Sequence, residues 1–205
     1  MATEQDSAEE LSNVVELKTT SVPPPRKPSG AKVRMTGQQR REQLLSVGRK
    51  LFAEKGFETV TVEEIAAKAG VSKPVVYEHF GGKEGLYAVV VDREMNYLLD
   101  SISQSLTGSR NEGASARELV EQAGMALFNY IDSNPQGFRI LVRDSPVTTQ
   151  TGSFASLMVD IATQVEDVLA AEFKAHGIND KFAPMYSQML VGMVAFTGQW
   201  WLDVR

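Results

Sequence analysis

Apolar residues recur along most of the chain at the three- and four-residue spacing of an amphipathic helix. The first such segment begins at Gln38, and its apolar face is followed by Gly56, a residue type that ends helices. We find no strand-like alternation of apolar and polar residues, and no repeat with a period of roughly 20 to 50 residues. The pattern therefore predicts an all-α protein.

Two short helices with a tight turn between them are predicted next. Thr61 and Glu64 have the spacing of a capping box, in which each side chain bonds the backbone N–H of the other residue. Gly70 tolerates the left-handed conformation that ends the first short helix. The second is predicted over residues 73–79, with Ser72 as its N-cap.

Longer apolar patterns follow and predict a set of packed helices. A break is expected at residues 107–109, and Ser115 and Glu118 form a second capping box. Residues 144–153 have the composition of a loop. The helices are predicted over residues 83–106, 115–133, 138–142, 154–176 and 184–205.

Domain organisation follows from these elements. Residues 1–33 are polar and acidic, contain a proline-rich run, and show no helical or strand period, which predicts a disordered tail. We expect residues 34–82 and residues 83–205 to form two further units, the first with three helices and the second with the helices that follow.

The charge is divided unevenly along the chain. The formal net charge is -5, but residues 26–93 hold thirteen Lys or Arg against eight acids, whereas the segments on either side are acidic. A basic segment inside an acidic chain indicates a module that binds a polyanion. The alternative is that these charges form only a solvated face.

Composition excludes several other classes of protein. The 205 residues are enough for a hydrophobic core, and the absence of cysteine removes disulfides, thiolate metal sites and cysteine nucleophiles. The acidic N-terminus lacks the apolar block of a secretory signal. The longest apolar run, residues 189–196, is far shorter than the about 20 residues that span a bilayer. We expect a soluble cytoplasmic protein without a membrane partner.

The spacing between residues 62 and 76 is that of a helix-turn-helix. Two short helices that cross steeply need a small residue at the crossing, and Ala66 meets this need. The turn needs a residue that tolerates a positive φ, and Gly70 does so. Val76 provides the aliphatic side chain that the second helix buries under the first. The alternative is an ordinary helical hairpin without a DNA-binding role.

The side chains left on the outside suit a duplex. Ser72 and Lys73 lie at a helix N-terminus, where free N–H groups and positive potential favour phosphate. Val75 suits the methyl group of thymine, and Lys73 suits guanine O6 or N7. Tyr77, His79 and Lys83 complete the outward set.

These residues resemble the N-terminal signature of TetR-type transcriptional regulators over about residues 38–90. The resemblance is carried by Gly56-Phe57, Thr61-Val62-Glu63-Glu64-Ile65-Ala66, Ala69-Gly70-Val71-Ser72-Lys73, Tyr77-Glu78-His79-Phe80 and Lys83-Glu84-Gly85-Leu86. It implies a DNA-binding head, a fourth helix that links it to the body, and a helical-bundle body that binds an effector and dimerises. It also implies repression that a small ligand relieves.

The resemblance identifies the residues expected to contact DNA, which are Thr61, Ser72, Lys73, Val75, Tyr77, His79 and Lys83. Two features depart from the family pattern. Pro74 stands where the family often has glycine, which alters the approach of the backbone to DNA. The chain stops at Arg205, whereas similar members usually continue into a further helix, so either this protein dimerises with less or the chain is a fragment.

The body contains candidate residues for a ligand cavity and for a dimer contact. Sulfur and flat rings suit a largely apolar effector, and the candidate lining is Met125, Phe128, Phe138, Met158 and Trp200, with ordinary core packing as the alternative. The last helix is apolar on two sides, so one side is expected to meet a second copy. The candidate interface is Met189, Gly192, Ala195, Phe196 and Gly198, and the alternative is an ordinary buried helix.

A basic cluster near the N-terminus is a further candidate for contacts to phosphate or to the minor groove, with a solubilising tail as the alternative. It consists of Arg26, Lys27, Lys32, Arg34, Arg40 and Arg41. His79 and His176 lie in separate segments, and no Gly-rich phosphate loop or nucleophile motif is present, so we expect no metal site, cofactor or catalysis.

The function predicted from the sequence is a ligand-responsive repressor that binds a near-palindromic DNA operator as a homodimer. A non-switching architectural DNA-binding protein and a helical small-molecule-binding protein without DNA function are the alternatives.

Overall fold

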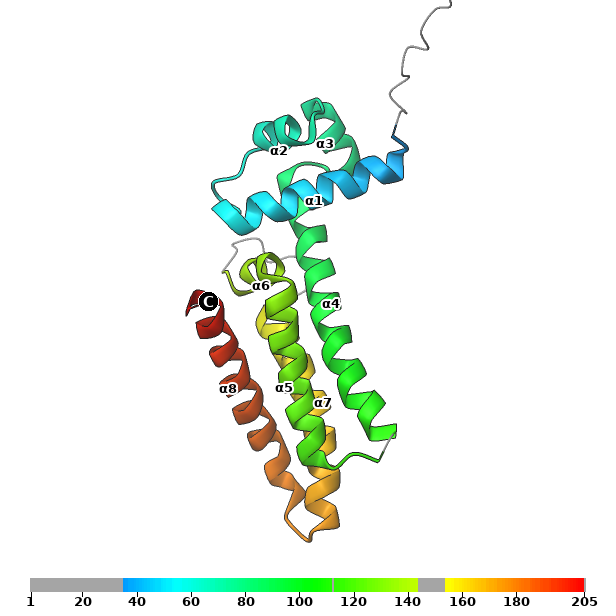
Figure 1. Ribbon diagram of the computed structural model, residues 1–205, viewed down its shortest axis with the longest axis vertical. Coiled ribbons are helices and arrows are strands. Elements are labelled where there is room, and N and C mark those ends of the chain that lie inside the picture. The colour runs from blue at the N-terminus through cyan, green and yellow to red at the C-terminus, as the bar shows by residue number, and fades with distance from the viewer. Residues whose placement is uncertain (1–34, 112, 144–153, 205) are drawn as a thin grey trace, which may run out of the picture. The chain divides into compact units, whose positions relative to one another are not determined.

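The computed structural model describes residues 35–111, 113–143 and 154–204. Within these ranges the chain forms eight α-helices, one short 3-10 helix and no strand (Figure 1). The predicted all-α fold is therefore confirmed. The tail predicted over residues 1–33 and the loop predicted over residues 144–153 lie outside the described residues.

Local signals set the ends of the first three helices, of which the second and third are short. They are α1 (Gly37–Lys55), α2 (Val62–Ala69) and α3 (Lys73–Phe80). Gly56 ends α1, as predicted. The Thr61 hydroxyl accepts the Glu64 N–H at 3.2 Å, which is half of the predicted capping box. The other half is not formed, because the Glu64 carboxylate accepts from Lys55 Nζ at 2.5 Å.

The fourth helix, α4 (Lys83–Asn111), leads from these helices into the rest of the chain. The predicted break at residues 107–109 was wrong, since α4 continues through them. A glycine inside a helix costs about 1 kcal/mol. Here Leu106, one residue before the expected break, is 5% exposed. Packing of this end of α4 therefore outweighs the weak local break.

The remaining helices are α5 (Ala116–Ser133), α6 (Pro135–Val142), α7 (Phe154–Ala175), the 3-10 helix Asp180–Phe182 and α8 (Ala183–Val204). The predicted capping box at Ser115 is formed in full. The short helix expected from Phe138 begins earlier, because Pro135 suits the first helical position, where no N–H is needed. Figure 1 shows α4, α5, α7 and α8 running lengthwise beside one another, in agreement with their packing contacts.

One hydrophobic core extends from α1 and α2 through α4 into the bundle. The core contains an aromatic cluster with ring centroids 4.8 to 6.2 Å apart. It is formed by Phe52 of α1, by Phe57 in the segment after α1, and by Tyr87 of α4. Gly48 allows the close approach of α1 to α4, since a Cβ there would lie 2.8 Å from Leu86 Cδ2. The helices of the predicted head are thus packed directly against the first turns of α4.

Candidate DNA-binding surface and effector cavity

The turn between α2 and α3 has the geometry that the sequence spacing predicts. Gly70 adopts the left-handed conformation, with φ 64° and ψ 37°. The N–H of Val71 then bonds the Ala66 carbonyl oxygen at 2.9 Å. Ala66 and Val76 are both buried. Ala66, Gly70 and Val76 therefore have the burial and the backbone conformation that the steric argument predicts. The segment is a helix-turn-helix.

The second helix of this motif, α3, is open to solvent over most of its surface. Val76 is its one buried residue, with an exposed fraction of 0%. The helix α3 packs against α2 and α4. Figure 1 shows α2 and α3 on the side of α1 that faces away from α5, α7 and α8. A duplex can therefore approach α3 without displacing any described part of the chain.

The predicted DNA-contacting residues divide into two groups by exposure. Thr61, Ser72, Lys73 and Tyr77 are exposed, and they come from the N-terminus of α2 and from α3. Val75, His79 and Lys83 are half-buried. Ser72 occupies the N-cap position of α3, but its side chain makes no capping hydrogen bond. Three of the exposed residues thus lie at the start or along the length of α3, and Thr61 lies at the start of α2.

Lys73 is paired within the motif. Its ammonium contacts the carboxylate of Glu63 in α2, and both side chains are more than half exposed. The hydrogen bond from Lys73 holds the pKa of Glu63 below its ordinary value. An exposed pair of this kind contributes little to stability, so Lys73 can exchange this partner for a phosphate.

Lys83 binds backbone in this structure. Its ammonium donates to the carbonyl oxygens of Phe57, Glu58 and Val60 at 3.1 to 3.4 Å, and it lies 4.5 Å from the centroid of the Phe57 ring. The first residue of α4 is thereby tied to the segment that precedes α2. A phosphate contact by Lys83 stays a prediction.

Two positioning residues in α1 were missed from the sequence. Arg41 Nη1 donates to the His79 carbonyl oxygen at 2.7 Å, and its guanidinium lies 4.3 Å from the centroid of the Phe80 ring. Gln43 Nε2 donates to the Ala69 carbonyl oxygen at 3.1 Å. Arg40 and Arg41 were grouped with the basic cluster near the N-terminus, but both lie within α1, and Arg41 bonds the C-terminal end of α3. Its position three and four residues before the buried Leu44 and Leu45, on the same face of α1, was the one sequence signal for this role, and the sequence does not show which carbonyl Arg41 meets.

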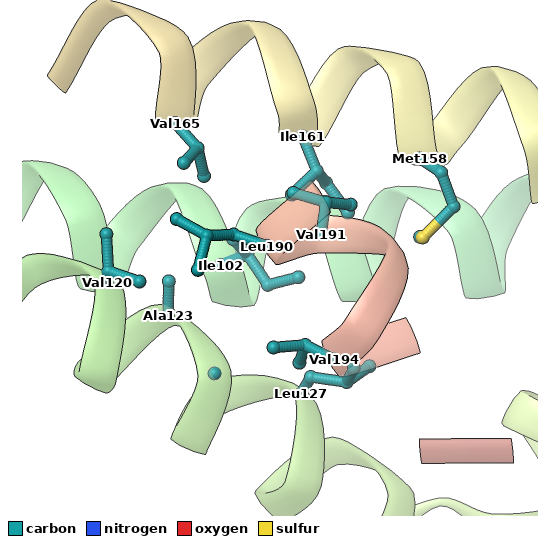
Figure 2. A pocket seen from close by; sticks show the side chains of 11 residues that line it. Ile102, Val120, Ala123, Leu127, Met158, Ile161, Val165, Leu190, Val191 and Val194 are labelled. Atoms are coloured by element: carbon teal, nitrogen blue, oxygen red, sulfur yellow. The ribbon is translucent and has the colours of Figure 1, made fainter. Parts of the chain in front are cut away.

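A cavity lies within the bundle between α4, α5, α7 and α8 (Figure 2). Its lining is entirely apolar and consists of Ile102, Val120, Ala123, Gly124, Leu127, Met158, Ile161, Val165, Leu190, Val191 and Val194. Its volume is about 40 Å³, whereas ligand pockets usually measure about 300 to 1,000 Å³. A ligand must therefore push the helices apart to enter.

The residues predicted to line a cavity are dispersed by the fold. Met158 lines the cavity, but Met125 and Trp200 are each 57% exposed. Phe138 is fully buried, with its ring edge against Tyr130 and Phe154. Phe128 is half-buried and its ring packs edge-on against Trp201. The residue types suited an apolar pocket, but only the packing of the helices decides which of them face it.

The last helix, α8, carries an exposed apolar stripe. Met189 and Phe196 of the predicted dimer contact are 54% and 75% exposed, and Gly192 is exposed between them. Ala195 and Gly198 are buried instead. A Cβ at Gly198 would lie 2.9 Å from Ile131 Cδ1, so this glycine admits α5 of the same subunit rather than a second copy. Neighbouring positions extend the exposed stripe, namely Met185, Met193 and Trp200.

Two further properties of the described residues concern metal sites and membrane spans. No cluster of three or more His, Asp or Glu side chains there has a geometry that holds a metal ion. In the same ranges, no helix combines the length and the apolar character needed to cross a membrane.

The exposed second helix of a helix-turn-helix, joined to a helical bundle, defines the class of helix-turn-helix DNA-binding proteins. The family model described as "Bacterial regulatory proteins, tetR family" matches residues 44–90. The chain is also 30% identical over 172 residues to the HTH-type transcriptional activator FasR of Mycolicibacterium smegmatis, a match that covers 83% of this chain and 75% of that protein. The chain belongs to the tetR family, and it is a DNA-binding transcriptional regulator.

Solved structures share the fold. A TetR-like transcriptional regulator from Rhodococcus sp. RHA1 is 22% identical, with a TM-score of 0.67, and the match covers 80% of this chain and 85% of that one. The fatty acid degradation regulator FadR from Bacillus halodurans is 18% identical, with a TM-score of 0.64 and coverage of 80% and 84%. A gamma-butyrolactone receptor described as an ArpA-like protein is 21% identical, with a TM-score of 0.61 and coverage of 80% and 84%.

Proposed function

We propose that the protein is a ligand-responsive regulator that binds a near-palindromic operator as a homodimer. Residues 34–82 bind the DNA, and residues 83–205 bind the effector and the second subunit. The openness of α3 carries the proposal, because Val76 is its one buried residue and Lys73, Pro74, Tyr77 and Glu78 are exposed. Two such helices enter successive major grooves about 34 Å apart. The protein acts in the cytoplasm, where its operator lies.

The DNA contacts are assigned by exposure and chemistry. Ser72, Lys73 and Tyr77 contact phosphates at the start and along the outer face of α3, and Thr61 does so at the start of α2. Val75 and His79 lie at the edges of this face and approach the bases. Lys83 reaches the nearest phosphate while it stays close to the carbonyl oxygens that it now binds.

The dimer contact is assigned to the outer stripe of α8. Exposed apolar patches of this kind mark protein interfaces, and the stripe runs from Met185 to Trp200 without an intervening charge. The inner face of the same helix contributes Leu190, Val191 and Val194 to the cavity wall. A ligand that moves α8 therefore acts on the separation of the two subunits and of their α3 helices.

The effector is assigned as a largely apolar, uncharged molecule, because no polar side chain lines the cavity. Straight-chain alkanols of increasing length are suitable probes, with the matching carboxylates as the charged comparison. We expect a long alkanol to raise the melting temperature and to release the operator in a band-shift titration, and the carboxylate to act more weakly. Release by the carboxylates alone would overturn the assignment.

Gly124 offers a direct control of the cavity. A Cβ there meets no atom within 4 Å, so Gly124→Ala adds one methyl group at the cavity wall without a clash. The variant should bind the operator normally and respond less to alkanols. Gly37→Ala, at a position that is equally open and outside the cavity, is the matched control and should respond as the native protein does.

Band shifts also separate the alternatives. If the protein binds selected genomic fragments and alkanol releases them, the result supports a ligand-responsive regulator. If it binds the fragments and no effector changes the binding, the result supports an architectural DNA-binding protein. Failure to bind any fragment supports a small-molecule-binding protein without DNA function. A promoter–reporter assay measures the sign of regulation: we propose repression, so deletion of the gene should raise expression. Lower expression would show an activator, as FasR is by name.

A further inference from the structure

Glu94 is unusual in its surroundings. It lies in α4 between the buried residues Val90 and Leu98, one helical turn from each, and within the part of the chain that the structure describes it is the one buried charged residue, with 8% exposed. A carboxylate taken out of water must be compensated by hydrogen bonds and by an opposite charge. The partners of Glu94 therefore show which helices meet at this carboxylate, and this meeting point is called the joint below.

The opposite charge comes from the DNA-binding head. Arg49 of α1 donates from Nε to Glu94 Oε1 at 2.5 Å and from Nη2 to Oε2 at 3.2 Å. The same Nη2 donates to Asn134 Oδ1 at 3.2 Å, at the junction of α5 and α6. The two bonds fix the plane of the guanidinium as well as its position.

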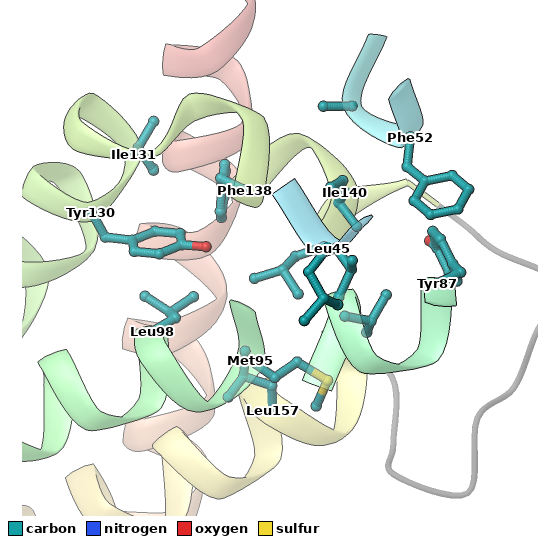
Figure 3. Close-up of a cluster of buried hydrophobic side chains, with 14 of the residues drawn as sticks. Leu45, Phe52, Tyr87, Met95, Leu98, Tyr130, Ile131, Phe138, Ile140 and Leu157 are labelled. Atoms are coloured by element: carbon teal, nitrogen blue, oxygen red, sulfur yellow. The ribbon is translucent and has the colours of Figure 1, made fainter. Parts of the chain in front are cut away.

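The remaining hydrogen bond comes from the body. Tyr130 of α5 donates its hydroxyl proton to Glu94 Oε2 at 2.8 Å. Figure 3 shows the Tyr130 ring inside the buried cluster, beside Leu98 and Phe138. Burial and the neighbouring Glu94 raise the pKa of Tyr130 far above its ordinary range, so the hydroxyl keeps its proton and remains a donor.

The fourth side of the joint is α6. A Cβ at Gly137 would lie 1.9 Å from Glu94 Oε2 and 2.8 Å from the Tyr130 hydroxyl oxygen. Only glycine leaves room for the carboxylate in this place. Arg49 of α1 and Tyr130 of α5 thus bond one carboxylate of α4, and Gly137 of α6 packs against it. A shift of α1, α4 or α5 changes these bonds, and a shift of α6 changes the space that the carboxylate occupies.

The same helices form walls of the cavity. On α4, Ile102 lies two turns from Glu94, a distance of about 12 Å at 1.5 Å per residue. On α5, Leu127 lies one turn from Tyr130. A change in the spacing of α4 and α5 at the cavity therefore reaches the joint through two continuous helices.

We infer that the Glu94 carboxylate, held by Arg49 and Tyr130, couples the helical body to the DNA-binding head as a positioning residue. This inference deepens the proposed function and rests on it for the direction of the signal. DNA and effector need not touch Glu94. DNA binding and effector binding each shift the contacts of Glu94. Because such coupling is reciprocal, a change in the head also changes the body.

Operator DNA tests the joint without any effector. Hydrogen exchange is measured with and without a selected operator fragment, in the full-length protein and in Tyr130→Phe, which removes one hydroxyl and keeps the ring. In the native protein we expect DNA to slow exchange in residues 127–138 by about fivefold or more, the lower end of typical couplings. In Tyr130→Phe that response should be lost while DNA still binds, with an unchanged salt slope.

A matched variant and a second perturbation complete the design. Tyr97→Phe changes a neighbouring ring, 5.6 Å from Tyr130 between centroids, and should retain the response. Gly137→Ala keeps every polar side chain but pushes against the Glu94 carboxylate and the Tyr130 hydroxyl, and it should lose the response, whereas Gly37→Ala should retain it. A lower baseline stability in any variant does not imitate this result, because the readout is the change that DNA causes.

The outcomes decide the inference separately from the proposed function. It is overturned if native residues 127–138 do not respond to DNA, if Tyr130→Phe responds as the native protein does, or if Tyr97→Phe also loses the response. Absence of release by alkanols would count against the proposed effector class alone, since the exchange experiment contains no alkanol.

Discussion

The exposed faces of α3 and α8 differ in chemistry although both are helices that their own subunit leaves partly uncovered. On α3 the exposed side chains are polar or charged, apart from Pro74, and Tyr77 is 54% exposed. Along the exposed stripe of α8 the side chains are Met, Phe and Trp, and Phe196 is 75% exposed. A polar face is solvated and stays open until a polyanion displaces its water, whereas an apolar stripe of this length needs a permanent cover. A similar degree of exposure therefore does not show what kind of partner a surface binds, and the chemistry of the exposed side chains must be considered as well.

The largest expected effect comes from a charge on the α8 stripe. Met193→Glu should give a monomer and weaken operator binding by about 100-fold, because an unpaired carboxylate opposes burial and two linked half-site contacts are lost. Sedimentation and band shifts measure both. Met125→Glu on α5 is the matched control, since the two methionines are 58% and 57% exposed. A dimeric Met193→Glu protein with native affinity would move the interface elsewhere.

A smaller effect is expected on α3. Tyr77→Phe removes a hydroxyl that suits phosphate and should weaken binding across sequences by about two- to tenfold, the usual worth of one hydrogen bond. Fluorescence anisotropy with several duplexes measures it. Tyr97→Phe, at a tyrosine with the same 54% exposure but on α4, should leave the affinity unchanged. Equal losses in the two variants would remove Tyr77 from the phosphate contacts.

Lys73→Met should lower the slope of log affinity against log salt by about one, as expected for one lost phosphate contact. Titrations at several salt concentrations measure the slope, and Lys181→Met in the 3-10 helix is the control. Selection of bound sequences adds a second reading. If base preference becomes blurred, Lys73 also reads a base, whereas an unchanged preference confines it to positioning. An unchanged salt slope would contradict the assignment.

The smallest effect is expected at Glu63. Glu63→Gln releases Lys73 from its partner and should raise affinity by about two- to threefold, in line with the small worth of exposed ion pairs. Because Lys73 lowers the pKa of Glu63, the pair is intact at neutral pH and weakens only as the pH falls through that lowered pKa. Glu121→Gln on α5 is the control, with 58% exposure against 59% for Glu63. Lower affinity in Glu63→Gln would show that the pair orients Lys73.

The sequence predicted those features that local chemistry decides. Thr61, Gly70 and Ser115 begin or end helices through contacts within a few residues, so their roles follow from spacing alone. The steric roles of Ala66 and Val76 follow from the short turn between them. The expected break at residues 107–109 failed because its outcome depends on the packing around α4.

Features that depend on which helices pack together could not be predicted from the sequence. Met125 and Met158 are the same residue type on helices of similar pattern, yet one is exposed and the other lines the cavity. Gly198 was expected to admit a second subunit, but α5 of its own subunit occupies that space. The position of Glu94 in an apolar face was the one sequence signal for the joint, and its partner Arg49 lies 45 residues away.

The attachment of α3 bears on how new regulators arise. The position of α3 depends on the buried side chain of Val76, on the turn at Gly70 and on the hydrogen bond from Arg41 to the C-terminal end of α3. None of these three is a side chain assigned to reading bases. Mutations can therefore change which genes the protein recognises while folding is preserved, and a duplicated copy can acquire a new target by a few substitutions on the outer surface of one helix.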